Sequence, residues 1–90
     1  MSERVDPESL IEFPCHYQFK AVGVADGVFK NAVVEAISRH IPVVDDAVHC
    51  KASGKGKYLS VSVMVTLHNF KQLKEIYAAL RQIQGMKMLL

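Results

Sequence analysis

The chain has 90 residues, of which 50% are hydrophobic and 22% charged, and its formal net charge is +2 at pH 7. This length predicts a single domain, because hydrophobic cores usually divide only above roughly 250 residues, and the composition excludes wholesale disorder. No apolar run approaches the ~18 residues of a membrane span, and the acidic first dozen residues do not resemble a signal peptide.

The first 13 residues are predicted to form an N-terminal extension with a short helix. Asp6 can accept hydrogen bonds at a helix N-terminus, and Pro7 suits the first helical position. Pro14 disfavours helical geometry at Phe13 and ends the helix there. Residues 14–90 are predicted to form the folded domain.

A strand and a helix are predicted next. In residues 16–25 the apolar Tyr17, Phe19 and Ala21 occupy every second position, and this period of two predicts a strand with one buried face. Asp26 can cap a helix that ends near His40, because Pro42 cannot continue it. The apolar residues of this helix recur at helical spacing and are expected to be buried: Val28, Phe29, Ala32, Val33, Ala36, Ile37 and Ile41.

The middle of the chain predicts a β-hairpin. Residues 43–47 indicate a loop or the start of a strand, residues 48–53 a short strand, and residues 54–56 a turn rich in glycine. Residues 57–68 give the clearest strand of the chain. One face of it consists of Leu59, Val61, Val63, Val65 and Leu67, and the other of Tyr58, Ser60, Ser62, Met64 and Thr66.

A second helix and a terminal strand complete the chain. Asn69, followed three residues later by Gln72, resembles a capping box in which asparagine replaces serine or threonine. The expected buried stripe of this helix is Phe70, Leu73, Ile76, Tyr77, Leu80 and Ile83. Gly85 ends the helical region, and residues 86–90 are predicted to form a short strand.

The resulting order is strand, helix, strand, strand, helix, strand. Right-handed crossovers convert this order into a ferredoxin-like α+β sandwich with four antiparallel strands in the spatial order 4-1-3-2. Each helix has a single apolar stripe, so both helices are expected on one face of the sheet. The other face is expected to stay open.

The open face is the candidate functional surface. It is expected to combine small hydroxyls, apolar groups and cations, which suits a carboxylate with an apolar body, such as lipoate or an amino acid. The candidate ligand-binding or interface residues are Lys20, Val22, Lys51, Tyr58, Ser60, Ser62, Met64 and Lys87, with His49 as a further member. A merely solvated face is the alternative. Unpaired edge strands also favour a homodimer.

Metal, disulfide and enzyme interpretations find little support in the sequence. Adjacent residues on a strand point to opposite faces, so neither Cys15-His16 nor His49-Cys50 makes a ready pair of metal ligands. The predicted strand order separates the two cysteines by two strand spacings, roughly 9–10 Å, which is too far for a disulfide. Free thiols fit a reducing cytoplasm. No nucleophile–base signature is present, so neither a catalytic residue nor a cofactor is predicted.

RNA binding is the rival interpretation, since RNA recognition motifs share this fold. Residues 48–90 carry a net charge of +6, which favours anionic partners, although lysines on a solvated hairpin and helix give the same charge. RNA recognition motifs stack bases on aromatic side chains, whereas the matching positions here are Lys57 and Leu59. Without such a platform, lysines bind RNA only weakly. An RNA-binding or protein-adaptor module that uses the basic second half stays the alternative function.

Several segments resemble the YbeD-like family of small bacterial proteins. They are Phe13-Pro14, the hairpin Ser53-Gly54-Lys55-Gly56-Lys57-Tyr58 running into Ser60-Val61-Ser62-Val63, the helix end Arg39-His40, and Met88-Leu89-Leu90. The resemblance implies a ferredoxin-like fold close to the ACT regulatory domains, which bind amino acids at subunit interfaces. It also implies a non-catalytic regulatory role linked to lipoate, because members of the family are described as lipoic-acid-binding regulatory proteins.

Overall fold

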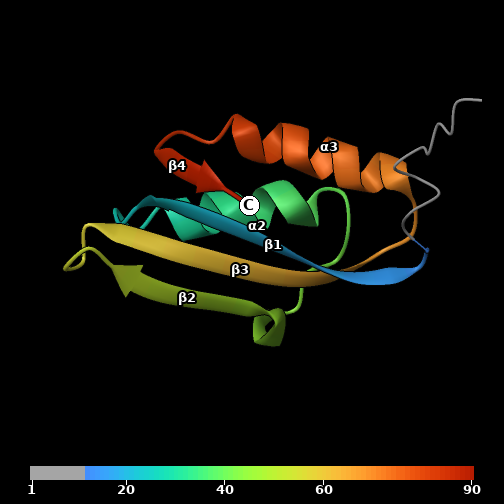
Figure 1. Ribbon diagram of the computed structural model, residues 1–90, viewed down its shortest axis with the longest axis horizontal. Helices are drawn as coiled ribbons and strands as arrows, with labels where there is room; N and C mark the ends of the chain where they lie inside the picture. Colours follow the sequence, from blue (N-terminus) through green and yellow to red (C-terminus); the bar gives the residue numbers. More distant parts are fainter. Residues whose placement is uncertain (1–11) are drawn as a thin grey trace, which may run out of the picture.

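The computed structural model describes residues 12–90 (Figure 1). In chain order the elements are β1 (Cys15–Val24), α2 (Phe29–Ser38), the 3-10 helix η1 (Asp45–Ala47), β2 (Val48–Ser53), β3 (Tyr58–Leu67), α3 (Phe70–Arg81) and β4 (Met86–Leu89). The predicted helix of the N-terminal extension falls mainly on residues 1–11, outside the described part, while Glu12 and Phe13 are not helical. Among residues 12–90, no helix has the length and apolar character needed to cross a membrane.

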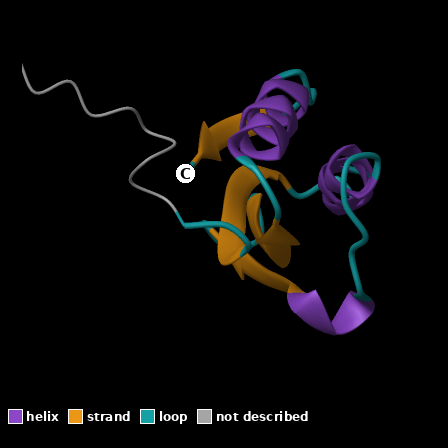
Figure 2. Cartoon of the chain, turned by 90° about the vertical axis from the view of Figure 1, so that its right-hand side faces the viewer, coloured by secondary structure: helices purple, strands orange, loops and turns teal. Residues whose placement is uncertain are grey.

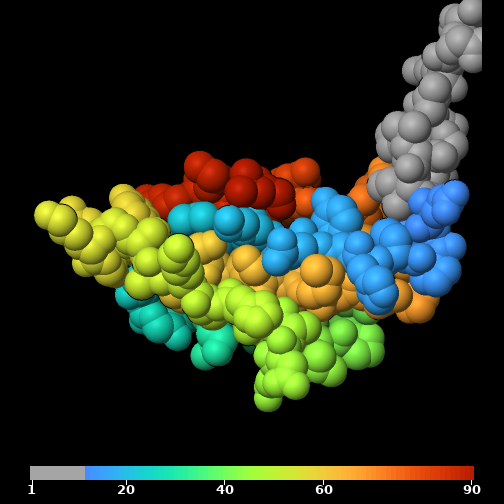
Figure 3. Space-filling model, turned by 60° about the horizontal axis from the view of Figure 1, so that its bottom comes forward, coloured from blue at the N-terminus to red at the C-terminus, as the bar shows by residue number. Residues whose placement is uncertain are grey.

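The four strands form one antiparallel sheet in the order β2-β3-β1-β4. The central strands β1 and β3 pair along their full length, from Cys15 opposite Leu67 to Val24 opposite Tyr58. Both α2 and α3 pack on one side of the sheet (Figure 2). Seen from the other side, the strands lie exposed next to one another, from red β4 through blue β1 and gold β3 to yellow-green β2 (Figure 3). These observations confirm the ferredoxin-like α+β fold.

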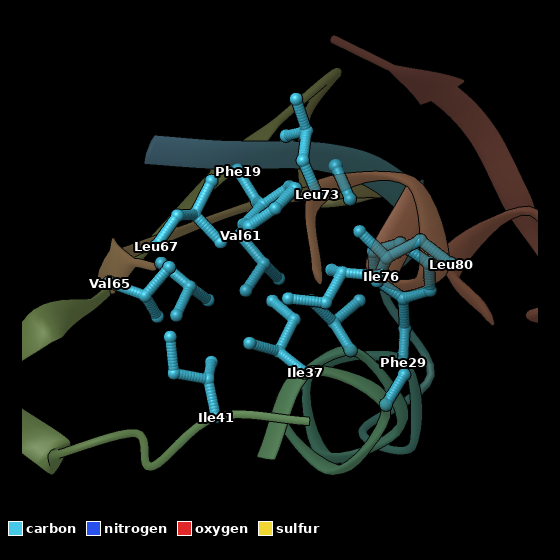
Figure 4. Close-up of a cluster of buried hydrophobic side chains, with 14 residues drawn as sticks. Phe19, Phe29, Ile37, Ile41, Val61, Val65, Leu67, Leu73, Ile76 and Leu80 are labelled. Carbon is cyan, nitrogen blue, oxygen red and sulfur yellow. The ribbon is translucent and has the colours of Figure 1, made fainter. Parts of the chain in front are cut away.

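The hydrophobic core fills the space between the sheet and the two helices (Figure 4). The predicted apolar face of β3 points into it, and Phe19 and Ala21 of β1 join that face from the neighbouring strand. The buried residues are Phe19, Ala21, Phe29, Val33, Ala36, Ile37, Ile41, Val61, Val63, Val65, Leu67, Leu73, Ile76 and Leu80. Full burial of one large apolar side chain contributes about 1.5–3 kcal/mol, so this cluster is the main source of stability.

Helix α2 begins with a side-chain cap, as the sequence predicts. The Oδ1 atom of Asp26 accepts hydrogen bonds from the backbone N–H groups of Val28 and Phe29, at 3.0 and 3.1 Å. The expectation that Val28 belongs to the buried stripe is wrong, because Val28 is 65% exposed. Val28 precedes the first helical residue, so the 3.6-residue period does not set the direction of its side chain.

Helix α3 begins at a capping residue that differs in one detail from the predicted capping box. The Oδ1 atom of Asn69 accepts from the N–H of Gln72 at 2.9 Å, as expected. The Gln72 side chain, however, accepts from the N–H of His68 at 2.8 Å and not from Asn69. The two hydrogen bonds still satisfy backbone donors at the start of the helix.

Strand β2 lies at one edge of the sheet and is exposed on both faces. Its register places Cys50 opposite Val61 and Ala52 opposite Leu59, on the side of the sheet that carries the helices. Both Cys50 and Ala52 are nevertheless exposed, because α2 packs against β3 and β1. On the side of the sheet that carries the helices, α2 and α3 therefore leave the edge formed by β2 uncovered.

Candidate functional site

The open face is the surface formed by side chains that point away from α2 and α3. The alternation of side chains along each strand and the three strand registers show which residues belong to it. It consists of His16, Gln18, Lys20, Val22 and Val24 on β1, Tyr58, Ser60, Ser62, Met64 and Thr66 on β3, His49, Lys51 and Ser53 on β2, and Met88 on β4. All predicted site residues except Lys87 therefore share one surface.

Two cross-strand rows run through the centre of the open face. They are Lys20–Ser62–His49 and Val22–Ser60–Lys51, each read from β1 through β3 to β2. Directly opposite residues of antiparallel strands have Cβ atoms about 4.5–5.5 Å apart, so the members of a row are within contact distance of their neighbours. The sheet thus brings together residues that are distant in the sequence, such as Lys20 and Ser62, which lie 42 positions apart.

The two lysines of these rows are available to an anion. Lys20 and Lys51 are exposed, and neither forms an ion pair with another residue in the range 12–90. The half-buried hydroxyls of Ser60 and Ser62 lie between the two strands that carry these lysines. Ammonium and hydroxyl groups are hydrogen-bond donors, so the rows can receive a carboxylate.

Apolar side chains flank the donors. Met64 and Met88 are 43% and 53% exposed, and Met88 lies opposite the half-buried Val22. Methionine is flexible and adapts to the shape of a bound group. The open face therefore offers apolar contact next to its cationic and hydroxyl groups.

Two predicted members lie at the margin of this surface. Tyr58 is 38% exposed and sits at the hairpin end of the face, opposite Val24 on β1. Lys87 has no partner on β1, because the register between β1 and β4 shifts at Val22/Gly23. Met88 lies opposite Val22 and therefore belongs to the open face, whereas Lys87 is the extra residue at the shift.

The open face is flat at its centre. One hollow of about 330 Å³ reaches its end, where His16, Met64 and Thr66 meet Ile41 and Val44. A larger hollow of about 620 Å³ lies on the helix side, between α2 and the η1–β2 segment. A ligand on the central rows would therefore lie on a surface and not inside a pocket.

The basic residues of the second half are spread over different parts of the described structure. Lys51, Lys55 and Lys57 lie on β2 and the β2–β3 turn, whereas Lys71 and Lys74 lie on α3, across the sheet. Among residues 12–90, Tyr58 at the hairpin end of β3 is the one Phe, Tyr or Trp side chain on the open face. RNA recognition motifs stack bases on several aromatic side chains of the central strands, and one tyrosine at the end of a strand does not form such a platform.

The thiols and imidazoles of residues 12–90 do not form a metal-binding cluster. Cys15 is half-buried and Cys50 exposed, and both are free thiols. The Nδ1 atom of His16 is 3.2 Å from the hydroxyl of Thr66, and that of His40 is 4.0 Å from a carboxylate oxygen of Glu75. Within residues 12–90, no three metal-ligating side chains come together.

Comparison with known proteins places the chain in a family. Residues 8–90 match the family model described as "Protein of unknown function (DUF493)". The chain belongs to this family. Among its relatives, the UPF0250 protein of Buchnera aphidicola subsp. Cinara cedri is 37% identical over 92% of this chain and 94% of its own length. The UPF0250 protein of Shewanella sediminis is 39% identical over 92% of this chain and 93% of its own length. The resemblance to the YbeD-like family is confirmed, because that family is UPF0250.

Solved structures support the fold. The solution structure of protein HP0495 from H. pylori matches 99% of this chain and 98% of its own, with a TM-score of 0.74 and 17% identity. The ACT domain from the GTP pyrophosphokinase of Chlorobium tepidum matches 84% of this chain and 83% of its own, with a TM-score of 0.66 and 17% identity. The DUF493 chain is thus ACT-like in fold.

A tyrosine pair, which the sequence did not single out, fixes α3 to β1 and to the end of the chain. The hydroxyls of Tyr17 and Tyr77 are 2.6 Å apart, and the Tyr77 hydroxyl also donates to the carbonyl of Leu90 at 3.1 Å. The Phe19 ring packs edge-on against both tyrosines. Burial, followed by the hydrogen bond with Tyr17, raises the pKa of Tyr77 well above its ordinary value of 10.

We expect this pair to make the protein less stable in strong base. The folded state holds the Tyr77 proton more tightly than the unfolded chain does, so its contribution is complete below pH 10 and is lost as the pH rises from 10 towards the raised pKa. Tyrosinate absorbance should show one late-titrating tyrosine, and Tyr77→Phe should remove that late step. The free energy of unfolding should fall less steeply above pH 10 in Tyr77→Phe; equal slopes in both proteins would contradict the assignment.

Proposed function

We propose that this DUF493 chain is a non-catalytic, ligand-sensing regulatory domain that binds a small carboxylate with an apolar body on its open face. Lipoate and amino acids are the candidate ligands. The observation that carries the proposal is the alignment of Lys20, Ser62, Ser60 and Lys51 across three strands, with neither lysine paired to a carboxylate in residues 12–90. The ACT-like fold supports a regulatory role by analogy alone.

A non-catalytic role agrees with the surroundings of the serines. The nearest approach of a hydroxyl to an imidazole on the open face is that of Thr66, 3.2 Å from Nδ1 of His16, and Ser62 is the cross-strand neighbour of His49. Within the described residues, no carboxylate pairs with His16 or His49 to orient it. Both serines lie in mid-strand, where backbone N–H groups take part in the sheet ladder and are not free to stabilise an oxyanion.

The expected affinity is modest. Each exposed lysine–carboxylate pair contributes about 0.2–1 kcal/mol, and apolar contact on a flat surface adds about 25 cal/mol for each Å² buried. Binding in the range of roughly 0.1–1 mM, about −5 to −4 kcal/mol, is therefore expected for one copy of the chain. At this affinity the apolar body matters as much as the charge.

Amide NMR titration tests the proposal. We expect lipoate and octanoate to shift amide signals on β1 and β3, and lipoamide, which keeps the apolar body but lacks the carboxylate, to shift them much less. A panel of amino acids separates the two candidate ligand classes. The absence of shifts on these strands with every ligand, or equal shifts with lipoamide, would overturn the carboxylate site.

Substitution of the lysines gives the matched prediction. Lys20→Gln and Lys51→Gln should each weaken lipoate binding by a factor of about 1.4 to 5, because each removes one exposed ion pair worth about 0.2–1 kcal/mol. Lys71→Gln on α3 makes the same charge change away from the open face and should leave the affinity unchanged. Equal weakening by all three variants would indicate a general charge effect instead of a site.

A further inference from the structure

Among residues 12–90, strand β2 pairs with another strand along one edge only. Its inner edge pairs with β3 from Val48 to Ser53, and its outer edge lies at the margin of the sheet. An exposed edge presents a row of free N–H and C=O groups that can pair with another strand. Proteins often protect such edges with a covering helix or loop, but here the residues from His49 to Ser53 are all exposed.

The helix side of β2 leaves room for close approach. Cys50 and Ala52 point to this side and are exposed, and both have small side chains. A strand added at the outer edge of β2 would extend the sheet past these two residues. Side chains of the added strand that point to the helix side would then cover Cys50 and Ala52, which are otherwise exposed to water.

The two ends of β2 carry opposite charges. Asp45 and Asp46 belong to η1, directly before the strand, and Lys55 and Lys57 lie in the turn directly after it. Neither aspartate forms an ion pair with a residue in the range 12–90. An antiparallel neighbour with the same sequence would place its basic turn beside η1 and its own η1 beside this basic turn. Parallel pairing would bring like charges together at both ends.

We propose that two copies of the chain associate through antiparallel pairing of their β2 strands, so that the two sheets become one continuous sheet. The two-fold symmetry of such a pair uses each charge contact twice. The acidic η1 segment of each copy then neutralises the basic β2–β3 turn of the other. The main cost is the approach of Lys51 of one copy to Lys51 of the other on the shared open face.

Charge reversal tests this arrangement. The association of the unliganded protein is measured by sedimentation equilibrium over a range of concentrations. Asp45→Lys/Asp46→Lys should weaken it at least about tenfold, since several exposed pairs worth about 0.2–1 kcal/mol each become repulsive. Lys55→Glu/Lys57→Glu should weaken it to a similar extent. The variant that carries all four substitutions restores opposite charges at both ends and should associate like the unaltered chain.

Matched controls separate the interface from net charge and from folding. Lys71→Glu/Lys74→Glu on α3 makes the same charge change as the turn variant and should leave association unchanged. Circular dichroism of each variant shows whether the monomer is folded. A chain that stays monomeric at every concentration, or a four-substitution variant that does not regain association, would overturn the proposal. If neither the aspartate variant nor the turn-lysine variant weakened association, the proposal would also be overturned, because the two copies would then meet at a different edge of the sheet. None of these measurements uses a ligand, so their outcome is independent of the carboxylate site.

Discussion

Phe19→Ala is expected to lower the free energy of unfolding by about 3–5 kcal/mol, which is the usual cost of truncating a buried phenylalanine to alanine. Phe19 is 1% exposed on the central strand β1, and its ring centroid lies 4.9 Å from that of Tyr17 and 5.1 Å from that of Tyr77. The whole domain is stable by only about 5–13 kcal/mol, at 0.05–0.15 kcal/mol per residue. This one change therefore removes a large fraction of the total stability.

Urea denaturation monitored by circular dichroism measures the effect, and the neighbouring residue provides the control. Gln18 lies on the same strand but points to the open face, where it is exposed. Gln18→Ala should change the free energy of unfolding by no more than about 0.5 kcal/mol. Similar losses for both variants would show that the two faces of β1 are not divided into a buried and an open side.

The topology could be predicted from the sequence because each element carries its own periodic signal. On β3, an aliphatic residue recurs at every second position from Leu59 to Leu67, and only one orientation of the pleat turns this face towards the core. Asp26 and Asn69 mark the beginnings of the two helices through the hydrogen bonds that the structure shows. One apolar stripe per helix then requires both helices to lie on the same face.

Features that depend on distant parts of the chain could not be predicted in this way. The alternation within a strand tells which residues share its open side, but it does not tell which residue of the next strand lies opposite. The row Lys20–Ser62–His49 depends on two registers that only the folded chain defines. The sequence predicts Lys87 on the open face, but the register shift at Val22/Gly23 leaves Lys87 without a partner on β1 and places Met88 opposite Val22. A shift of one residue exchanges the two faces of a strand.

Gly23→Ala is expected to be destabilising by about 1–3 kcal/mol, the usual range for overpacking a core. A Cβ atom at Gly23 would lie well inside van der Waals contact with the ring of Phe29. Phe29 is 2% exposed, so its ring would have to shift within the packed core to admit the added methyl group. Gly23 has no positive φ angle, which means that the expected cost comes from this steric conflict and not from backbone strain.

A thermodynamic cycle with Phe29→Leu isolates the steric conflict. Leucine lacks the ring atoms that meet the added methyl group, so Gly23→Ala should cost at least about 1 kcal/mol less in the Phe29→Leu background. Gly27→Ala is the contrasting case, because Gly27 has a φ of 81° and no atom within 4 Å of an added Cβ. Its cost of about 1–2 kcal/mol arises from the left-handed backbone and should be the same with either residue at position 29. If Phe29→Leu relieved both substitutions equally, or neither, close packing between the β1 end and α2 would not be the reason for glycine at position 23.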